Sequence, residues 1–419
     1  MARRSILGGL AALVLLAAAA HAEELSIVSG ATGVDLEILR QQLDRFERYS
    51  GNKVRIVPRP SSPADQFADY RRWLSDPGAD IDVYAMDNTW ASQLADRLAD
   101  LTGATADVVA VHFPVTIRAQ TVDGRLMALP FFAEAPVLYY RKDLLDRYGF
   151  KPPATWAELT ATAKAVMDRE RAAGNTAMWG YVFQGAPYEG LTANALEWIA
   201  SNGGGLIVDP DGTVTVDNPR AAGILELARS WIGAIAPPDV LSFTEEESRA
   251  VWQAGNAVFM RNWPYAYALG NANDSPIRNR FDIAPLPSGE GGRSAATLGG
   301  WALALSKNST QREAATALIR YLAAPEQQAY RALRAADLPT LPLLYDDKDI
   351  AEEQPAMLKW KPVVEGAILR PAAVTASKYD EVSKEFWTAV HETLSGRGSA
   401  ARNLSALKER LERLRGPAW

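Results

Sequence analysis

The sequence predicts an α/β protein built as two lobes that are joined by several chain crossings. Strand and helix patterns alternate between residues 25 and 90, which is typical of an open sheet with parallel strands. Similar patterns return after residue 255, and no single point divides the chain cleanly. The length of 419 residues, at roughly 150 residues per domain, also favours more than one domain.

The first 22 residues have the pattern of a cleavable export signal. Arg3 and Arg4 precede an apolar run, and Ala20-His21-Ala22 fits a small-x-small cleavage site. The run of about 15 residues is short for a membrane-spanning helix, although a short anchor is the alternative. No cysteine is present to carry a lipid. We therefore exclude residues 1–22 from the fold and expect a periplasmic protein, exported by the Sec or the twin-arginine route.

Residues 25–90 contain three predicted strands and two predicted helices in alternation. Residues 25–30, 53–58 and 81–86 are apolar enough for strands. Residues 35–49 have apolar side chains at helical spacing, and a second helix is predicted over 64–74. Ligands of such sheets bind beyond the carboxyl ends of the strands, where Gly30 and Asp87 lie.

The later chain mixes helices with short strands. A hairpin arm over 124–130 leads into 131–141, and Thr155 with Glu158 forms a capping box for a helix that runs to Arg171. Asp209 to Gly212 reads as a hairpin turn. Further helices are predicted over 144–148, 191–201, 219–232, 245–253, 311–322 and 378–414, and further strands over 257–260, 281–284 and 301–305.

Composition excludes several kinds of functional site. The chain has no cysteine and only three histidines, so thiolate metal sites and cysteine nucleophiles are excluded, and a Ser-His-Asp hydrolase is hard to build. The formal charge is 44 − 50 = −6, which argues against binding to nucleic acid. No P-loop, dinucleotide fingerprint or HExxH motif is present. We expect no cofactor and no metal.

Several of the 12 tryptophans lie in turns or at strand ends. Trp263 precedes a proline and Trp301 follows two glycines, so neither is easily buried as ordinary core, although packing is the alternative for both. A broad aromatic face with carboxylates nearby suits a sugar, whose C–H face packs on the ring. Trp198, Trp231 and Trp387 lie in helical patterns and are predicted to be core residues.

Three charged residues stand out by their surroundings. Asp87 ends an apolar strand, where a carboxylate either caps the next helix or accepts hydrogen bonds from a ligand. Glu134 lies in an apolar segment and is either a ligand contact or the partner of an arginine. Arg370 precedes a proline, and its planar guanidinium either grips two hydroxyls or a carboxylate, or forms a surface salt bridge.

Taken together, these segments resemble the extracellular solute-binding proteins of ABC sugar importers, in the maltose-binding-protein class. The resemblance covers about residues 25–400 and looks closest to the trehalose/maltose-binding branch. RNWPY and ATLGGW are its most specific motifs. The motifs that carry it are VYAMDNTW, LYYRKDLLDRY, YEGL, SNGG, GNAVFMRNWPY and AATLGGW.

The resemblance implies a periplasmic-binding-protein fold with a central ligand cleft between its two α/β lobes. Residues 23–131 and about 302–345 would form the N-terminal lobe. Residues 132–301 and about 346–419 would form the C-terminal lobe. The implied ligand contacts are Asp35, Asp87, Phe132, Glu134, Trp263, Tyr265, Gly300, Trp301 and Arg370.

Each of these contacts has an implied role. Asp87 resembles the N-lobe carboxylate that binds sugar hydroxyls, Glu134 falls at a second acidic contact, and Asp35 would replace an early glutamate. Trp263 and Tyr265 resemble the C-lobe stacking pair. Gly300 and Trp301 would supply a backbone contact and an indole contact. Arg370 would correspond to the arginine that members of the family carry late in the C-terminal lobe.

Two segments depart from the family pattern. Phe132 stands where a tyrosine is common, which removes one hydroxyl contact. Residues 58–67 match poorly, because Ser61 and Gln66 stand where trehalose-binding relatives carry threonine and arginine. The loss of these polar partners could change the second sugar ring or remove it.

The function implied is that of a monomeric receptor that closes on a disaccharide or related glycoside, trehalose- or maltose-like. It would deliver this sugar to the transmembrane subunits of a permease, with the ATPase subunits acting indirectly, and would do no bond chemistry or nucleic-acid binding. The alternatives are a secreted glycoside hydrolase using Asp87 and Glu134, and a receptor for a charged solute such as a polyamine or phosphate ester.

Overall fold

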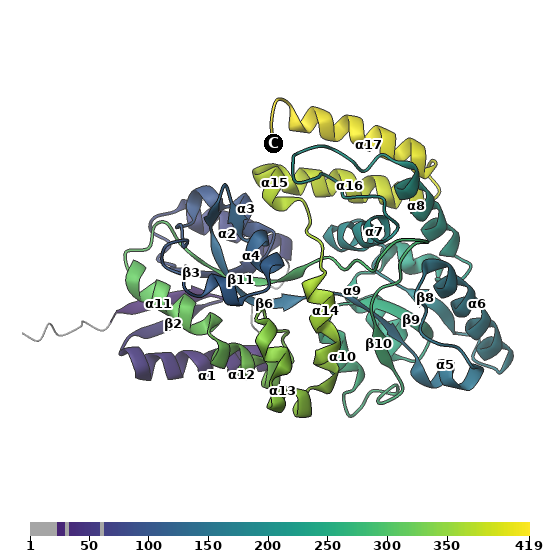
Figure 1. The fold of residues 1–419 in the computed structure, drawn as a ribbon, viewed down its shortest axis with the longest axis horizontal. Coiled ribbons are helices and arrows are strands. Elements are labelled where there is room, and N and C mark those ends of the chain that lie inside the picture. The colour runs from purple at the N-terminus through teal and green to yellow at the C-terminus, as the bar shows by residue number, and fades with distance from the viewer. Residues whose placement is uncertain (1–22, 30–32, 59–62) are drawn as a thin grey trace, which may run out of the picture.

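The computed structural model describes residues 23–29, 33–58 and 63–419. The expected leader, together with Gly30 and Ser61, lies outside these residues. Two lobes stand side by side, each with its own sheet and covering helices (Figure 1). Within the described residues no helix is both long and apolar enough to cross a membrane.

The N-terminal lobe is built on a five-stranded sheet in the order β2-β1-β3-β11-β6. Strand β1 pairs in parallel with β2 and β3, as the alternating pattern predicts, and β11 runs antiparallel between β3 and β6. The strands are β1 (Glu24–Val28), β2 (Lys53–Val57), β3 (Val83–Asp87), β6 (Ala128–Glu134) and β11 (Gly299–Leu305). Helices of this lobe are α1 (Gly33–Ser50), α2 (Pro63–Ser75), α3 (Trp90–Gln93), α4 (Pro114–Ala119), α11 (Arg312–Ala323) and α12 (Pro325–Ala335).

The C-terminal lobe is built on a four-stranded sheet in the order β10-β7-β9-β8. Its strands are β7 (Val137–Tyr140), β8 (Trp179–Val182), β9 (Ala257–Asn262) and β10 (Asp282–Ala284). Its helices include α5 (Lys142–Tyr148), α6 (Trp156–Ala172), α7 (Glu189–Ser201), α8 (Pro219–Trp231), α9 (Glu245–Gln253) and α10 (Tyr265–Gly270). The capping box at Thr155 is confirmed at the start of α6.

The last part of the chain links the lobes and covers the C-terminal one. Helix α15 packs against α3 of the N-terminal lobe, whereas α16 and α17 lie over α7 and α8 (Figure 1). These late helices are α13 (Lys348–Glu353), α14 (Lys361–Glu365), α15 (Ala372–Thr375), α16 (Tyr379–Leu394) and α17 (Ala400–Arg415). A small hairpin joins β4 (Thr121–Val122) to β5 (Arg125–Leu126), and 3-10 turns lie at Ala95–Arg97, Val109–Val111, Pro238–Ser242, Pro342–Asp346, Pro355–Trp360 and Ala376–Lys378.

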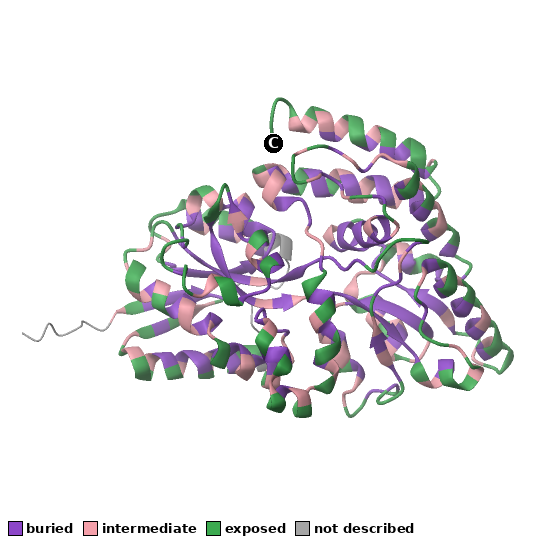
Figure 2. Ribbon diagram, in the orientation of Figure 1, coloured by how far each residue is buried: buried purple, intermediate pink, exposed green. Residues whose placement is uncertain are grey.

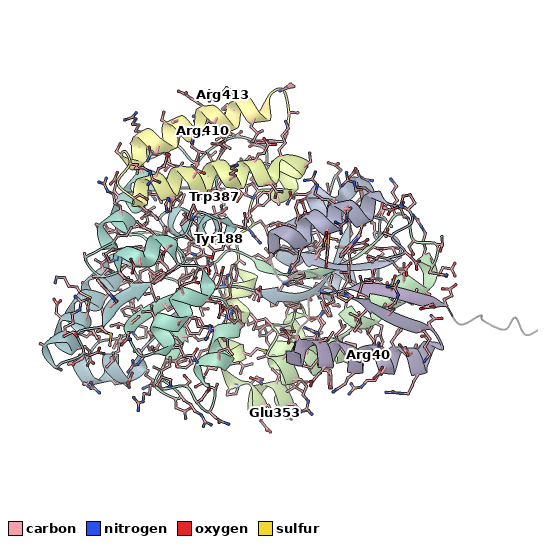
Figure 3. All side chains as sticks on the ribbon, turned by 180° about the vertical axis from the view of Figure 1, so that it is seen from behind. Arg40, Tyr188, Glu353, Trp387, Arg410 and Arg413 are labelled. Carbon is pink, nitrogen blue, oxygen red and sulfur yellow. The ribbon has the colours of Figure 1, made fainter. Side chains whose placement is uncertain are left out.

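Buried residues concentrate in the two sheets and on the inner faces of the helices (Figure 2). Trp198 and Trp231 are buried as predicted, and their ring centroids lie 5.7 Å apart. Trp387 differs from the prediction, because it packs against the core of its lobe but remains partly exposed on α16 (Figure 3). The helix predicted over 378–414 is two helices, since Gly396 and Gly398 adopt positive φ between them.

The chain crosses between the lobes a few residues away from the expected boundaries. Residues 132–134 pair within the first sheet at the end of β6, so the first crossing lies between Glu134 and Val137. Gly300 and Trp301 also belong to the first sheet, because β11 pairs with β3. Trp301 therefore stands on the N-terminal lobe rather than on the C-terminal one.

Candidate functional site

A cavity of about 230 Å³ lies between the lobes, and we call it the cleft cavity. The first sheet supplies most of its wall, helix α12 and the residues after it supply one end, and the C-terminal lobe supplies Pro264 and Tyr265. Five of the predicted contacts line the cavity. They are Asp35, Phe132, Glu134, Tyr265 and Trp301.

Strand register places an acid and two aromatic residues in one row across the first sheet. Asp87 on β3 pairs with Trp301 on β11, and Trp301 pairs with Phe132 on β6. Directly opposed residues project from the same face of a sheet, so acceptor oxygens stand beside aromatic rings. The register shifts between Trp301 and Ala302, and such bulges re-aim side chains near functional sites.

Two glycines allow close approaches at this row: Gly299 between the two lobes, and Gly300 between two strands of the first sheet. A Cβ on Gly299 would lie 2.7 Å from the ring of Trp263, and a Cβ on Gly300 would lie 2.4 Å from the backbone oxygen of Phe132. Gly300 also has φ of +107°, which side-chain-bearing residues rarely adopt. The structure therefore brings Trp263 of the C-terminal lobe directly against β11.

Carboxylates at the start of α9 hold the two aromatic residues of the C-terminal lobe. The indole nitrogen of Trp263 donates to Glu245 at 3.3 Å, and the hydroxyl of Tyr265 donates to Glu246 at 2.7 Å. Tyr188, labelled in Figure 3, donates to the other oxygen of Glu245 at 2.6 Å. These bonds fix the ring orientations before any ligand arrives.

One face of the Trp263 ring packs against a buried ion pair. The guanidinium carbon of Arg261 lies 4.4 Å from the ring centroid of Trp263. Arg261 in turn donates two hydrogen bonds to Glu197 on α7, and both side chains are 1% exposed. Separating the two buried charges would be costly, because each would then be left without a partner. The ion pair therefore holds Arg261 in place beneath the ring.

Asp87 is not the N-cap of α3, although it binds the residue that is, and its role as a ligand acceptor stays a prediction. Its Oδ1 atom accepts hydrogen bonds from the backbone nitrogen of Thr89 at 2.8 Å and from the Thr89 hydroxyl at 2.7 Å. These bonds shape the turn into α3, whose N-cap is Thr89 itself. The Asp87 side chain is still 28% exposed, so it remains accessible to a ligand.

Arg370 is a buried tie between the lobes rather than a surface residue. Its side chain is 5% exposed, and it donates to Glu189 on α7 at 2.7 Å and to Asn88, after β3, at 2.9 Å. Its Nη2 atom also lies 3.5 Å from Asp87. Glu189 accepts further bonds from Tyr379 and Ser383 of α16. The role of Arg370 in gripping a ligand stays a prediction.

Glu134 has no ion-pair partner among the described residues, so the arginine partner considered for it is not found there. Burial raises the pKa of Glu134 to about 8, and the negative charges of Asp337, Asp87 and Glu245 add to this increase. Arg370 acts in the opposite direction but does not cancel the effect. Glu134 therefore holds a proton at neutral pH.

Asp35 is an exposed residue at the start of α1 that still lines the cavity. Partial desolvation and the charge of Asp337 raise the pKa of Asp35, whereas Arg331 lowers it. Within residues 23–29, 33–58 and 63–419, no group of three or more acidic or histidine side chains could hold a metal ion.

Several residues of the site were not predicted. Tyr188 and Glu189 lie in the YEGL motif, which carried the resemblance without an assigned role. Glu245 and Glu246 lie in the acidic first turn of the helix predicted over 245–253, and neither was given a role. Arg331 and Asp337 carry no sequence signal of their own, because only the return of the chain from α12 to β6 brings them to the cleft.

The chain is similar to known proteins over nearly its whole length. The sequence profile of the bacterial extracellular solute-binding proteins matches residues 30–329. A probable ABC transporter-binding protein of Deinococcus radiodurans is 42% identical over 413 residues, which is 98% of each chain.

Solved structures share the fold. The maltose-bound MalE3 of T. maritima is 37% identical, with a TM-score of 0.84, covering 94% of this chain and 100% of that chain. A solute-binding protein of Thermotoga lettingae, bound with α-D-tagatose, is 20% identical with a TM-score of 0.79, at the same coverage. The second likeness shows the fold alone.

Proposed function

Because this chain belongs to the bacterial extracellular solute-binding protein family, we propose that it is the sugar-binding receptor of an ABC importer. The observation that carries this proposal is the row Asp87–Trp301–Phe132, which faces Trp263 and Tyr265 of the other lobe. Carboxylate acceptors beside aromatic faces are the chemistry that recognises a pyranose ring, whose hydroxyls donate while its C–H face packs.

We infer that the ligand is a disaccharide of the maltose or trehalose type. The T. maritima relative, at 37% identity, was solved with maltose bound. Another similar protein was solved with tagatose bound and a further one is named for mannitol, so the sugar is a proposal that depends on the contacts in this cleft. Asp35 and Asp337 make an anionic ligand unfavourable there, since each can carry a negative charge.

Ligand binding would drive closure of the lobes. In this proposal Trp263 and Tyr265 of one lobe would supply the aromatic contacts, and Asp87 of the other lobe would supply an acceptor; of these three residues, Tyr265 lines the cleft cavity. A sugar held by both sets favours the closed state, because only that state makes all contacts at once. The closed receptor would then deliver its sugar, outside the inner membrane, to the permease subunits.

The proposal is tested by a thermal-shift screen followed by calorimetry on the protein without its leader. The panel is maltose, trehalose, sucrose, glucose, mannitol and spermidine. We expect the melting temperature to rise with the concentration of maltose or trehalose, because a ligand that binds only the folded state stabilises it. The sugar should be recovered intact. A shift with spermidine alone, or release of glucose from the disaccharide, would overturn the proposal in favour of a charged-solute receptor or a hydrolase.

A further inference from the structure

Arg331 is a buried cation in the wall of the cleft cavity with most of its hydrogen-bonding capacity unused. Its side chain is 4% exposed, and it makes one hydrogen bond to another described residue, from Nη2 to Asp337. Its Nε atom is buried and has no hydrogen-bond partner among the residues that the structure describes. A guanidinium has five N–H donors, and buried donors in native proteins are nearly always satisfied. The unused donors therefore indicate a missing acceptor.

The position of this arginine is fixed by aromatic packing. The guanidinium carbon of Arg331 lies 4.5 Å from the ring centroid of Phe131 and 5.2 Å from that of Phe132. Such stacking holds the planar group in one orientation and leaves its edge free for hydrogen bonding. Phe132 is itself a cavity residue, so this edge lies beside the space that a ligand would fill.

Asp337 reaches the same place through an unusual backbone turn. Helix α12 ends at Ala335, and the C-cap residue Ala336 adopts left-handed geometry with φ of 57°, a conformation that costs about 1 kcal/mol for a residue other than glycine. The next residues then return to the sheet, where the backbone nitrogen of Ala133 donates to Leu338 at 2.8 Å. Asp337 is thereby held between α12 and β6, against Arg331.

The charges around this pair select the kind of ligand. The charge of Asp337 raises the pKa values of both Asp35 and Glu134, so the three carboxyl groups lie within electrostatic reach of one another. An anion would be repelled by Asp337 and Asp35, and a cation would be repelled by Arg331, whereas the protonated Glu134 carries no charge. A hydroxyl group fits both members of the pair, because it accepts from the guanidinium and donates to the carboxylate.

We propose that Arg331 and Asp337 form a sugar subsite that binds two neighbouring hydroxyl groups on one ring of the ligand. The inference rests on the proposed function and deepens it, since it assigns specificity to a pair outside the contacts implied by the resemblance. The subsite lies where α12 borders the cleft cavity, whose lining includes Tyr265 but not Trp263. It therefore determines which ring, and which hydroxyl pattern, that end accepts.

The test is a thermodynamic cycle that combines a substitution in the protein with removal of single hydroxyl groups from the sugar, with affinities measured by calorimetry. Maltose, or whichever disaccharide of the panel binds wild type best, is compared with its monodeoxy derivatives on wild type and on Asp337→Asn. We expect the substitution to weaken binding of the parent sugar tenfold to a hundredfold. One or two deoxy sugars should bind wild type more weakly than the parent sugar does. On the variant, these deoxy sugars and the parent sugar should bind with about equal affinity.

The control is Asp107→Asn, which changes an exposed aspartate paired with Arg320 far from the cleft and should leave every affinity unchanged. If Asp337→Asn fails to fold, the same cycle is run on Arg331→Lys, which keeps the charge but loses the planar edge. Equal weakening of the parent and all deoxy sugars, or no weakening, would overturn the subsite. Absence of any sugar binding by wild type would instead overturn the proposed function itself.

Discussion

Glu134 shows how the environment of one residue controls its chemistry. An isolated glutamate is ionised at neutral pH, but burial beside Asp337, Asp87 and Glu245 raises the pKa of Glu134 to about 8. In the cleft it is thus a neutral acid that can donate a hydrogen bond. This residue would help a site rich in carboxyl groups to accept an uncharged sugar.

The raised pKa predicts a specific pH dependence of stability. Between about pH 4.5 and pH 8 the folded state holds a proton that the unfolded state has released, so this residue makes folding less favourable as pH rises through that window. Glu134→Gln should remove this decline and raise the melting temperature most at pH 8 and above. Thermal unfolding from pH 4.5 to 9 measures the effect.

The matched control is Glu353→Gln, which changes an exposed glutamate on α13. Its melting temperature should follow the wild-type curve at every pH. If Glu134→Gln also followed that curve, Glu134 would be an ordinary ionised side chain.

Asp87 carries the second prediction for a single residue. Asp87→Asn keeps an oxygen that can accept from Thr89, so the turn into α3 should survive, but the negative acceptor for sugar hydroxyls is lost. We expect the affinity for the disaccharide to fall by about 1–3 kcal/mol. The melting temperature should fall modestly, because the buried Arg370 guanidinium loses a negative neighbour 3.5 Å away. An unchanged calorimetric titration would remove Asp87 from the site.

Among the elements, β11 is the strand on which the site depends. It lies between β3 and β6, and its first residues bring Gly300 and Trp301 next to Asp87 and Phe132. The β11–β6 pairing is close at this point because Gly300 has no side chain. The strand was predicted over 301–305, but it begins at Gly299. The two glycines before the predicted range are the residues that permit the close contacts.

Gly300→Ala should therefore destabilise the protein. Its Cβ would lie 2.4 Å from the Phe132 oxygen at a φ of +107°, so the strand must shift or strain, at a cost of about 1–3 kcal/mol. Gly223→Ala is the control, because that glycine is exposed on α8 with nothing near its Cβ, and alanine there should stabilise by up to about 1 kcal/mol. Denaturant unfolding of both variants measures the difference, and equal effects would contradict the role given to Gly300.

Local patterns predicted the elements well because helices and strands follow periodicity and capping. The helix at Thr155 and the three parallel strands of the first lobe are examples. The same patterns could not assign Trp301 to a lobe, since strand neighbours far apart in the sequence decide that. Nor could they find Arg331 and Asp337, whose function depends on a turn at Ala336 and on a distant strand.

At the scale of the whole molecule, Arg370 connects the two lobes. Its guanidinium binds Asn88 at the end of β3 and Glu189 at the start of α7, and Glu189 is also held by α16. Strand β3 belongs to the N-terminal lobe, α7 to the C-terminal lobe, and α16 to the segment that covers the C-terminal lobe. The resemblance implies that Arg370 contacts the ligand. Its observed hydrogen bonds join the two lobes.

Arg370→Gln should loosen this connection. The substitution removes charge-assisted bonds from a buried guanidinium to Glu189, which is itself 41% exposed and keeps its bonds from α16, so we expect a loss of about 1–3 kcal/mol in unfolding free energy. In small-angle scattering the unliganded variant should have a larger radius of gyration than wild type, because α7 is no longer tied to the end of β3. Arg320→Gln, which breaks an exposed pair within the N-terminal lobe, should cost at most about 1 kcal/mol and leave the radius unchanged. If both variants scatter like wild type, the lobes are held together by their packing and not by Arg370.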